Sequence, residues 1–363
     1  MTKRKNVFKI KALSLLVIGA LGTSVGLSSC GQSNNAESSS DLPNPTPISQ
    51  VAVNTDGTVK NVGYLEGDKI MNSLDVIAEP PANGSVAKTL DETIAQNVGK
   101  DLYGGDRWLQ AAIDADLASG SELANCHYDC QIGVHIDKDK TPHLYALLSR
   151  LHQTADDSGN YAKKYYNRLR PFKQGQAKNF GINTDKTCRP DMETSLIKGS
   201  YPSGHTTVGW LEGLVLATID PSHQNAIMAR AQEYSESRVV CNHHWYSDVD
   251  ASRALAGAIY ASLQQSDQYL ADLKAAKEEF SKVLADGSSP ANDKKYTLKE
   301  DSTATTEEDA DFQKVAQAIS GWNCDKENTI LEQNLSSIFA RGNYTAEQKD
   351  EQKDDSSSGK SGY

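Results

Sequence analysis

Apolar residues recur three and four positions apart along the central part of the chain, from about Thr89 to Ala285. This spacing places them on one face of an α-helix, whereas the alternation typical of strands is scarce. The pattern predicts helical segments at 90–118 (with a break at Gly104–Gly105), 141–172, 205–219, 250–265 and 264–285. Pro171 is expected to end the second, because proline lacks an N–H and clashes with the preceding turn. The chain is therefore predicted to be all-α, a single compact helical domain with a helix-bundle core.

The first thirty residues differ: a basic opening leads into an apolar run, Ala12–Leu27. The run is shorter than the roughly 20 residues that cross a bilayer, and it fits an export signal. Small residues precede Cys30 in the sequence LSSC, which resembles the bacterial lipobox, where the cysteine is lipidated. We predict a lipoprotein signal peptide over 1–29 and a membrane anchor at Cys30; the alternative is an ordinary signal with an incidental cysteine. The predicted location is the bacterial cell envelope, with the folded domain in the periplasm or outside the cell.

Composition divides the rest of the chain into three parts. Residues 30–80 begin polar and rich in Pro and Ser, which predicts a flexible tether and a segment leading into the domain. Residues 81–285 carry the helical pattern and form the predicted catalytic domain. Residues 286–363 are polar apart from Phe312–Asp325 and Thr329–Ala340, so this extension is expected to hold one or two short helices and a disordered tail.

The formal net charge of -11 argues against a general nucleic-acid binder, because phosphate backbones attract clustered positive charge. An acidic protein can still contain a local positive pocket, so the net charge does not exclude small anionic substrates.

Beyond Cys30 the sequence holds Cys126, Cys130, Cys188, Cys241 and Cys324. Export implies a compartment that permits disulfides, and since five is odd, at least one must stay free or pair between chains. Cys126 with Cys130, four residues apart, is one candidate pair, and Cys188 with Cys241 is a second. No CxxC pair or His/Cys cluster has the spacing of a structural zinc site, so no metal and no cofactor is predicted.

The stretch YPSGH, Tyr201–His205, stands directly before the most apolar segment of the domain. Proline and glycine favour a turn, and Ser203 can cap the helix that follows. Such a turn also directs backbone N–H groups and the positive end of the helix dipole toward one place. Ser203 and Gly204 can therefore cradle a phosphate with His205 as a titratable neighbour. From these residues alone, a capped helix with an incidental histidine is the alternative.

Two further groups carry candidate chemistry. Lys163 and Arg170 are seven residues apart, almost two helical turns, so both cations are expected on one helix face. Such a face suits a multiply charged anion, and the alternative is a basic surface exposed to solvent. His244 and Asp248 are four apart, the spacing at which a carboxylate can hold one imidazole nitrogen and leave the other as a lone pair. Arg238 lies upstream, and its fork matches phosphate oxygens. A metal-binding His/Asp pair or helix-surface pairing stays open here.

Together the three groups form the ordered pattern Lys-x6-Arg-Pro, Pro-Ser-Gly-His and Ser-Arg-x5-His-x3-Asp. The matching residues are Lys163, Arg170 and Pro171, then Pro202, Ser203, Gly204 and His205, then Ser237, Arg238, His244 and Asp248. The pattern resembles the phosphatidic acid phosphatase type 2/haloperoxidase superfamily, in particular the bacterial class A non-specific acid phosphatases, over roughly Leu90–Ala285. The resemblance implies the all-α fold of the acid phosphatase/vanadium haloperoxidase type. Cys30 and the C-terminal extension are not typical of the soluble secreted members of this group. They leave open where the protein is located and whether it forms a homo-oligomer.

The resemblance implies metal-independent hydrolysis of small phosphate monoesters through a covalent phosphohistidine, with a phosphotransferase side activity. His244 would be the nucleophile, oriented by Asp248, and His205 would protonate the leaving alcohol and then activate water. The phosphoryl oxygens would be held by Lys163, Arg170, Ser203, Gly204 and Arg238. His243 is the competing nucleophile, but it lies five residues from Asp248 where His244 lies four.

Four alternatives follow from the same residues. A vanadate-dependent haloperoxidase-like enzyme would use the same pocket for vanadate, and a nucleotide-specific, apyrase-like phosphohydrolase would differ only in its substrate. An integral lipid-phosphate phosphatase is disfavoured, because no segment after the signal reaches ~18 uninterrupted apolar residues. A phosphate-binding lipoprotein without catalysis is disfavoured by the complete His205, His244 and Asp248 set, since binding needs no oriented nucleophile.

Overall fold

The computed structural model describes residues 52–53, 59–60, 63–116, 127–178, 183–194, 196, 199–294, 296, 298 and 306–333. These residues all belong to one compact unit, Pro43–Tyr363. The predicted signal peptide, Cys30, Cys126 and the end of the chain beyond Gln333 lie outside the described residues. Among the helices that are described, none combines the length and the apolarity needed to cross a membrane.

The described chain is built almost wholly of helices, so the predicted all-α class is confirmed. The α-helices are α1 (Ser73–Val76), α2 (Val86–Asp101), α3 (Asp106–Ile113), α4 (Asp129–Ile132), α5 (Pro142–Tyr166), α6 (Pro171–Lys178), α7 (Gly204–Ile219), α8 (Gln224–Val240), α9 (Tyr246–Leu263), α10 (Asp267–Asp286), α11 (Thr306–Ala318) and α12 (Cys324–Gln333). The 3-10 helices are η1 (Gly67–Lys69), η2 (Pro190–Met192) and η3 (Ala291–Asp293). Two short strands, β1 (Ala52–Val53) and β2 (Val59–Lys60), pair antiparallel with Ala52 opposite Lys60.

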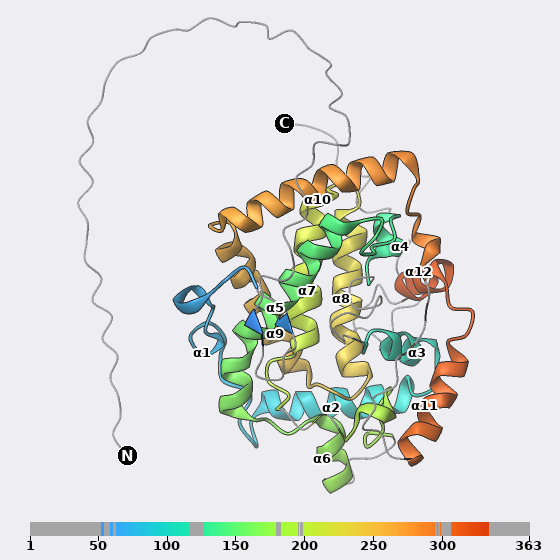
Figure 1. The fold of residues 1–363 in the computed structure, drawn as a ribbon. Coiled ribbons are helices and arrows are strands. Elements are labelled where there is room, and N and C mark those ends of the chain that lie inside the picture. Colours follow the sequence, from blue (N-terminus) through green and yellow to red (C-terminus); the bar gives the residue numbers. More distant parts are fainter. Residues whose placement is uncertain are drawn as a thin grey trace, which may run out of the picture. The chain divides into compact units, whose positions relative to one another are not determined.

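Helix α7 lies at the centre of the bundle, packed against α5, α8 and α9 (Figure 1). It is apolar on nearly every side, as expected of a helix surrounded by others. Close packing against α8 depends on Gly209, because a Cβ at that position would collide with the ring of Tyr234. Helix α10 crosses α5 and α7 at one end of the bundle, and α2 packs on α8 and α9. The bundle therefore holds the ends of α7, α8 and α9 in fixed positions.

Helix boundaries follow the sequence prediction at one break and depart from it at another. The break at Gly104–Gly105 is confirmed: α2 ends at Asp101, α3 begins at Asp106, and Gly104 adopts the left-handed φ of 73° that favours glycine. The prediction that Pro171 ends a helix was wrong. α5 already stops at Tyr166 before a left-handed Asn167, and Pro171 instead begins α6, where its missing N–H is not needed.

The segments flanking the predicted catalytic domain also pack on the bundle. Tyr64 and Leu65, within the predicted 30–80 segment, are only 7% and 5% exposed. The Tyr64 hydroxyl donates to Asp272 Oδ2 at 2.9 Å. In the predicted extension, each apolar piece overlaps a helix as far as the described residues reach: α11 packs against α3, and α12 packs against α3, α4 and α8. The division of the chain into four parts stays a prediction, but residues on both sides of 81–285 contribute to its packing.

Two disulfides are present in the described chain. Cys188 pairs with Cys241, which confirms one of the candidate pairs and ties the coil before η2 to the end of α8. The Cys126–Cys130 pairing was wrong: Cys130 in α4 bonds to Cys324, which is 194 positions away at the start of α12. The sequence did not indicate Cys324 as a partner, whereas packing of the extension brings the Cα atoms of Cys130 and Cys324 to 5.3 Å.

Candidate active site

The motif residues come from three places in the sequence and meet where α7 and α9 begin. The α8–α9 turn carries His244, whose Nδ1 lies 2.8 Å from the carbonyl oxygen of Ser200, just before α7. Arg170, in the coil between α5 and α6, places its NH1 nitrogen 3.1 Å from Nε2 of the same imidazole. Lys163 in the last turn of α5 donates to the carbonyl of Pro202 at 2.6 Å. Tertiary packing thus assembles the three motifs around one imidazole.

His244 and Asp248 are not neighbours on one helix, as their spacing had suggested. His244 lies in the turn before α9, and Asp248 lies in the first turn of that helix, where it accepts from the backbone N–H of Trp245 at 2.9 Å. Nδ1 of His244 is 3.5 Å from Asp248 Oδ2, farther than from the Ser200 carbonyl. Because a carbonyl oxygen only accepts hydrogen bonds, Nδ1 carries the proton and donates a hydrogen bond to the Ser200 carbonyl. Nε2 therefore carries the lone pair. Sequence reasoning missed Ser200, since a backbone acceptor has no side-chain signature.

Lys163 and Arg170 do not share a helix face either, because α5 ends between them at Tyr166. Arg170 and Arg238 are both buried, at 6% and 1% exposed, and neither has an ion pair with any described carboxylate. The Nε of Arg170, and Nε and NH1 of Arg238, have no hydrogen-bond partner among the described residues. Burial lowers the pKa of each guanidinium to about 10, so both remain charged at physiological pH. Buried charges are normally paired, so these two cations fit a site for an anion.

The YPSGH stretch forms the expected cap. Ser203 is the N-cap of α7, and its hydroxyl accepts from the backbone N–H of Thr206 at 3.3 Å. Gly204 is the first residue of α7, and an added Cβ there would meet only Asp156 Oδ1 at 3.6 Å, an ordinary contact. Packing of the described chain therefore gives no reason for a glycine, whereas close approach of an anion would. His205 follows, partly exposed, and its Nε2 donates to the carbonyl of Ala115 at 2.9 Å.

Comparison with known proteins identifies the family. The profile of the PAP2 superfamily matches residues 144–270. A non-specific acid phosphatase of Providencia stuartii is 36% identical over 227 residues, which cover 62% of this chain and 88% of the relative. The chain belongs to this family of acid phosphatases. An acid phosphatase of Zymomonas mobilis is also 36% identical, over 59% of this chain and 77% of the relative. A non-specific acid phosphatase of Salmonella typhimurium is 36% identical as well, over 58% of this chain and 81% of the relative. Both the resemblance and the predicted enzyme class are confirmed. The roles of individual site residues stay predictions.

The site histidines of this acid phosphatase, His205, His243 and His244, lie in surroundings that disfavour a positive charge. Burial, and then Arg170, hold the pKa of His244 well below its ordinary range, which keeps the imidazole neutral as a nucleophile requires. Burial and Arg238 also lower the pKa of His205, against the Ala115 hydrogen bond, which raises it. His243 is fully buried, and its Nδ1 accepts from Arg238 NH2 at 2.6 Å. His243 therefore supports Arg238, whereas His244 faces Arg170.

Arg168 contacts a candidate site residue, Asp248, and was missed by sequence reasoning. Its NH1 donates to Asp248 Oδ1 at 2.6 Å, and its NH2 donates to Asp91 Oδ2 in α2 at 2.7 Å. Asp248 is thus held from one side by Arg168 and from the other by the backbone of Trp245. The available signal was the sequence RLR, residues 168–170, because positions two apart in an extended segment lie on the same face and Arg168 therefore accompanies Arg170 toward the site.

No three His, Cys, Asp or Glu side chains gather as metal ligands within the described part of this acid phosphatase. Independence of metal ions stays a prediction from the resemblance.

Proposed function

We propose that the protein hydrolyses small phosphate monoesters through a covalent phosphohistidine on His244. The observation that carries the proposal is the pair of buried guanidinium groups, Arg170 and Arg238, which have no carboxylate partner among the described residues. Arg170 lies against the neutral imidazole of His244, and Arg238 lies against that of His243. A phosphate ester brings the negative charge that such a site needs. Lys163, Ser203 and the backbone N–H of Gly204 would complete the set of donors to the phosphoryl oxygens.

In the first step, Nε2 of His244 attacks phosphorus and the bond from phosphorus to the alcohol oxygen breaks. The positive charge that develops on the imidazole is stabilised by Asp248, while Nδ1–H stays bonded to the Ser200 carbonyl. Nε2 of His205 is bonded to Ala115, so its Nδ1 is the nitrogen that would take the proton carried in by the monoanionic ester and deliver it to the leaving oxygen. The alcohol leaves, and the phosphoryl group remains on His244.

In the second step, water attacks the phosphohistidine, with His205 as the base that takes its proton. The phosphorus–nitrogen bond breaks, inorganic phosphate forms and His244 returns to its neutral state. An alcohol that replaces water in this step would receive the phosphoryl group, which accounts for the proposed phosphotransferase side activity.

Activity is expected to fall as the pH rises through about 6, the second pKa of a phosphate monoester. The lowered pKa of His205 leaves it neutral in the free enzyme, so the proton for the leaving group enters with the monoanionic ester. The lowered pKa of His244 keeps the nucleophile neutral on the acid side, so activity should persist well below pH 6. The pH dependence of kcat/KM measures this directly. An alkaline optimum would contradict the assignment.

A vanadate-dependent peroxidase is the second candidate, because the anion site also suits vanadate. We expect hydrolysis of monoesters to survive EDTA, vanadate to inhibit it, and vanadate-loaded protein to show no oxidation of bromide by peroxide. The same assay over nucleotides and simple monoesters separates a nucleotide-specific enzyme from a broad one. Loss of hydrolysis in EDTA, or bromide oxidation without hydrolysis, would overturn the proposal.

We also propose that the enzyme is held at the cell envelope by a lipid on Cys30, in the periplasm or outside the cell. The support is the LSSC sequence after the apolar run Ala12–Leu27. Binding of nucleic acid is not proposed for a chain of net charge -11.

A further inference from the structure

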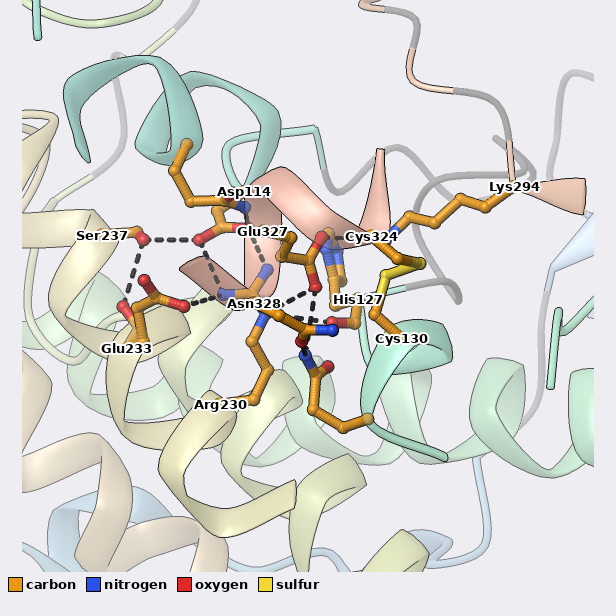
Figure 2. Close-up of polar contacts among 12 residues, drawn as sticks. Asp114, His127, Cys130, Arg230, Glu233, Ser237, Lys294, Cys324, Glu327 and Asn328 are labelled. Carbon is orange, nitrogen blue, oxygen red and sulfur yellow. Dashed lines mark hydrogen bonds and ion pairs between the residues drawn. A yellow bond between two sulfur atoms is a disulfide. The ribbon is translucent and has the colours of Figure 1, made fainter. Parts of the chain in front are cut away.

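The C-terminal extension carries a buried carboxylate into the helical bundle. Helix α12 begins at Cys324, which is bonded to Cys130 of α4, and three residues later Glu327 is 0% exposed. Figure 2 shows Glu327 pointing from α12 toward Arg230, whose side chain comes from α8. A carboxylate is very rarely buried in this way unless it is paired. The contacts of Glu327 therefore indicate what it does.

Glu327 is paired on both sides. One oxygen, Oε2, accepts from the Tyr296 hydroxyl at 2.8 Å and from Lys294 Nζ at 3.3 Å, and both donors also belong to the extension. The other, Oε1, lies 3.3 Å from Arg230 Nε. Arg230 is itself 0% exposed and also contacts Glu233 Oε2 at 3.2 Å. The extension thus supplies one of the carboxylates that surround a wholly buried arginine.

The same arginine holds Asp114 at the end of α3. Its NH2 donates to Asp114 Oδ1 at 2.5 Å and its NH1 to Oδ2 at 3.1 Å. Ser237, next to Arg238 in the chain, donates its hydroxyl to Asp114 Oδ2 at 2.5 Å. Asp114 is followed directly by Ala115, whose carbonyl accepts from His205. A continuous path of contacts therefore runs from α12 to the imidazole assigned to the leaving group.

The charges along this path balance. The cations are Arg107, Arg230 and Lys294, and the anions are Asp114, Glu233 and Glu327. Loss of the Glu327 charge would leave an excess buried cation, and Arg230 would shift toward its remaining carboxylates. Asp114 is one of these, so the end of α3 and the Ala115 carbonyl would move with it.

We infer that Glu327 is a positioning residue for catalysis. Through Arg230 and Asp114 it fixes the Ala115 carbonyl, and that carbonyl fixes the orientation of His205 toward the leaving alcohol. The inference rests on the proposed acid role of His205. It gives the C-terminal extension a function in the reaction.

The test measures kcat/KM of the Glu327→Gln variant with two substrates. This substitution removes the charge of the side chain and keeps its shape. An alkyl ester, glycerol 3-phosphate, needs its leaving oxygen protonated, whereas 4-nitrophenyl phosphate has a leaving group that departs as the anion. A misplaced acid lowers kcat/KM for the alkyl ester selectively. We expect a loss about 10-fold greater for the alkyl than for the aryl ester, part of the roughly 10²–10⁴-fold that a positioned acid supplies. A merely structural role lowers both values equally.

Glu332→Gln, an exposed carboxylate on the same helix, is the matched control and should match the wild type on both esters. His205→Ala is the reference and should show the full selective loss. If Glu327→Gln lowers kcat/KM equally for both esters, or for neither, while His205→Ala still shows the selective loss, the inference about Glu327 is overturned and the acid role of His205 stands. Equal losses in His205→Ala would overturn its proposed acid role and the inference with it. Should Glu327→Gln not fold, Tyr296→Phe removes one hydrogen bond to Glu327 and should give a smaller loss of the same selectivity; equal losses there would overturn the inference.

Discussion

His244→Ala should lower kcat/KM by at least about 10⁴-fold, the scale at which removal of a nucleophile acts. No other described group can replace it: Nε2 is the lone pair that faces Arg170, and His243 presents its Nδ1 to Arg238 instead. The variant should also lose the acid-labile phosphoenzyme that the wild type forms when radiolabelled substrate is quenched rapidly in alkali. Hydrolysis rates and the trapped label together measure the two consequences.

His243→Ala is the matched control, the adjacent imidazole in the same turn. It should keep much of the activity and retain the trapped phosphoenzyme, because its ring is not placed to attack. Since its Nδ1 accepts from Arg238 at 2.6 Å, we expect a moderate loss, about 10-fold, from a less well held arginine. Equal loss of label and rate in both variants would contradict the assignment of the nucleophile.

Arg230→Met should lower the free energy of unfolding by about 3–5 kcal/mol, the cost of removing one partner from a buried ion network. Methionine retains apolar bulk but leaves Asp114, Glu233 and Glu327 buried without their shared cation. Urea denaturation followed by circular dichroism measures the difference. Lys274→Met is the control: this lysine is 80% exposed and pairs with Glu278 on the surface, so its loss should cost less than about 1 kcal/mol.

The deficit of Arg230→Met should be larger at pH 8 than at pH 5. Burial by itself raises the pKa of Asp114, but in the wild type Arg230 outweighs burial and holds that pKa below its ordinary value. In the wild type, Asp114 therefore stabilises the fold at all pH values above its unfolded pKa. Without Arg230, burial dominates and the folded pKa rises above the unfolded one, so stability is lost as the pH increases and regained as it falls. An equal deficit at both pH values would show that lost packing, and not charge, is responsible.

The helical class, the break at Gly104–Gly105, the Ser203 cap and the family were all accessible from the sequence. Each depends on residues a few positions apart, and backbone geometry relates such neighbours in the same way in any helix or turn. The motif residues could be named for the same reason, because each motif occupies one short segment. Their arrangement could not be predicted, because a single helix was assumed for each pair. Helix α5 ends between Lys163 and Arg170, and helix α9 begins only after His244.

Only the tertiary structure decided the partners. The Ser200 carbonyl, not Asp248, is the nearest acceptor to His244 Nδ1, and backbone acceptors leave no trace in a pattern of side chains. Cys130 meets Cys324, and Glu327 meets Arg230, across stretches of chain far longer than any periodic pattern covers. The sequence by itself therefore determined which side chains are available for phosphate chemistry. Packing of distant helices determined which of them touch, because a buried charge selects its partner by proximity in the folded core and not by position along the chain.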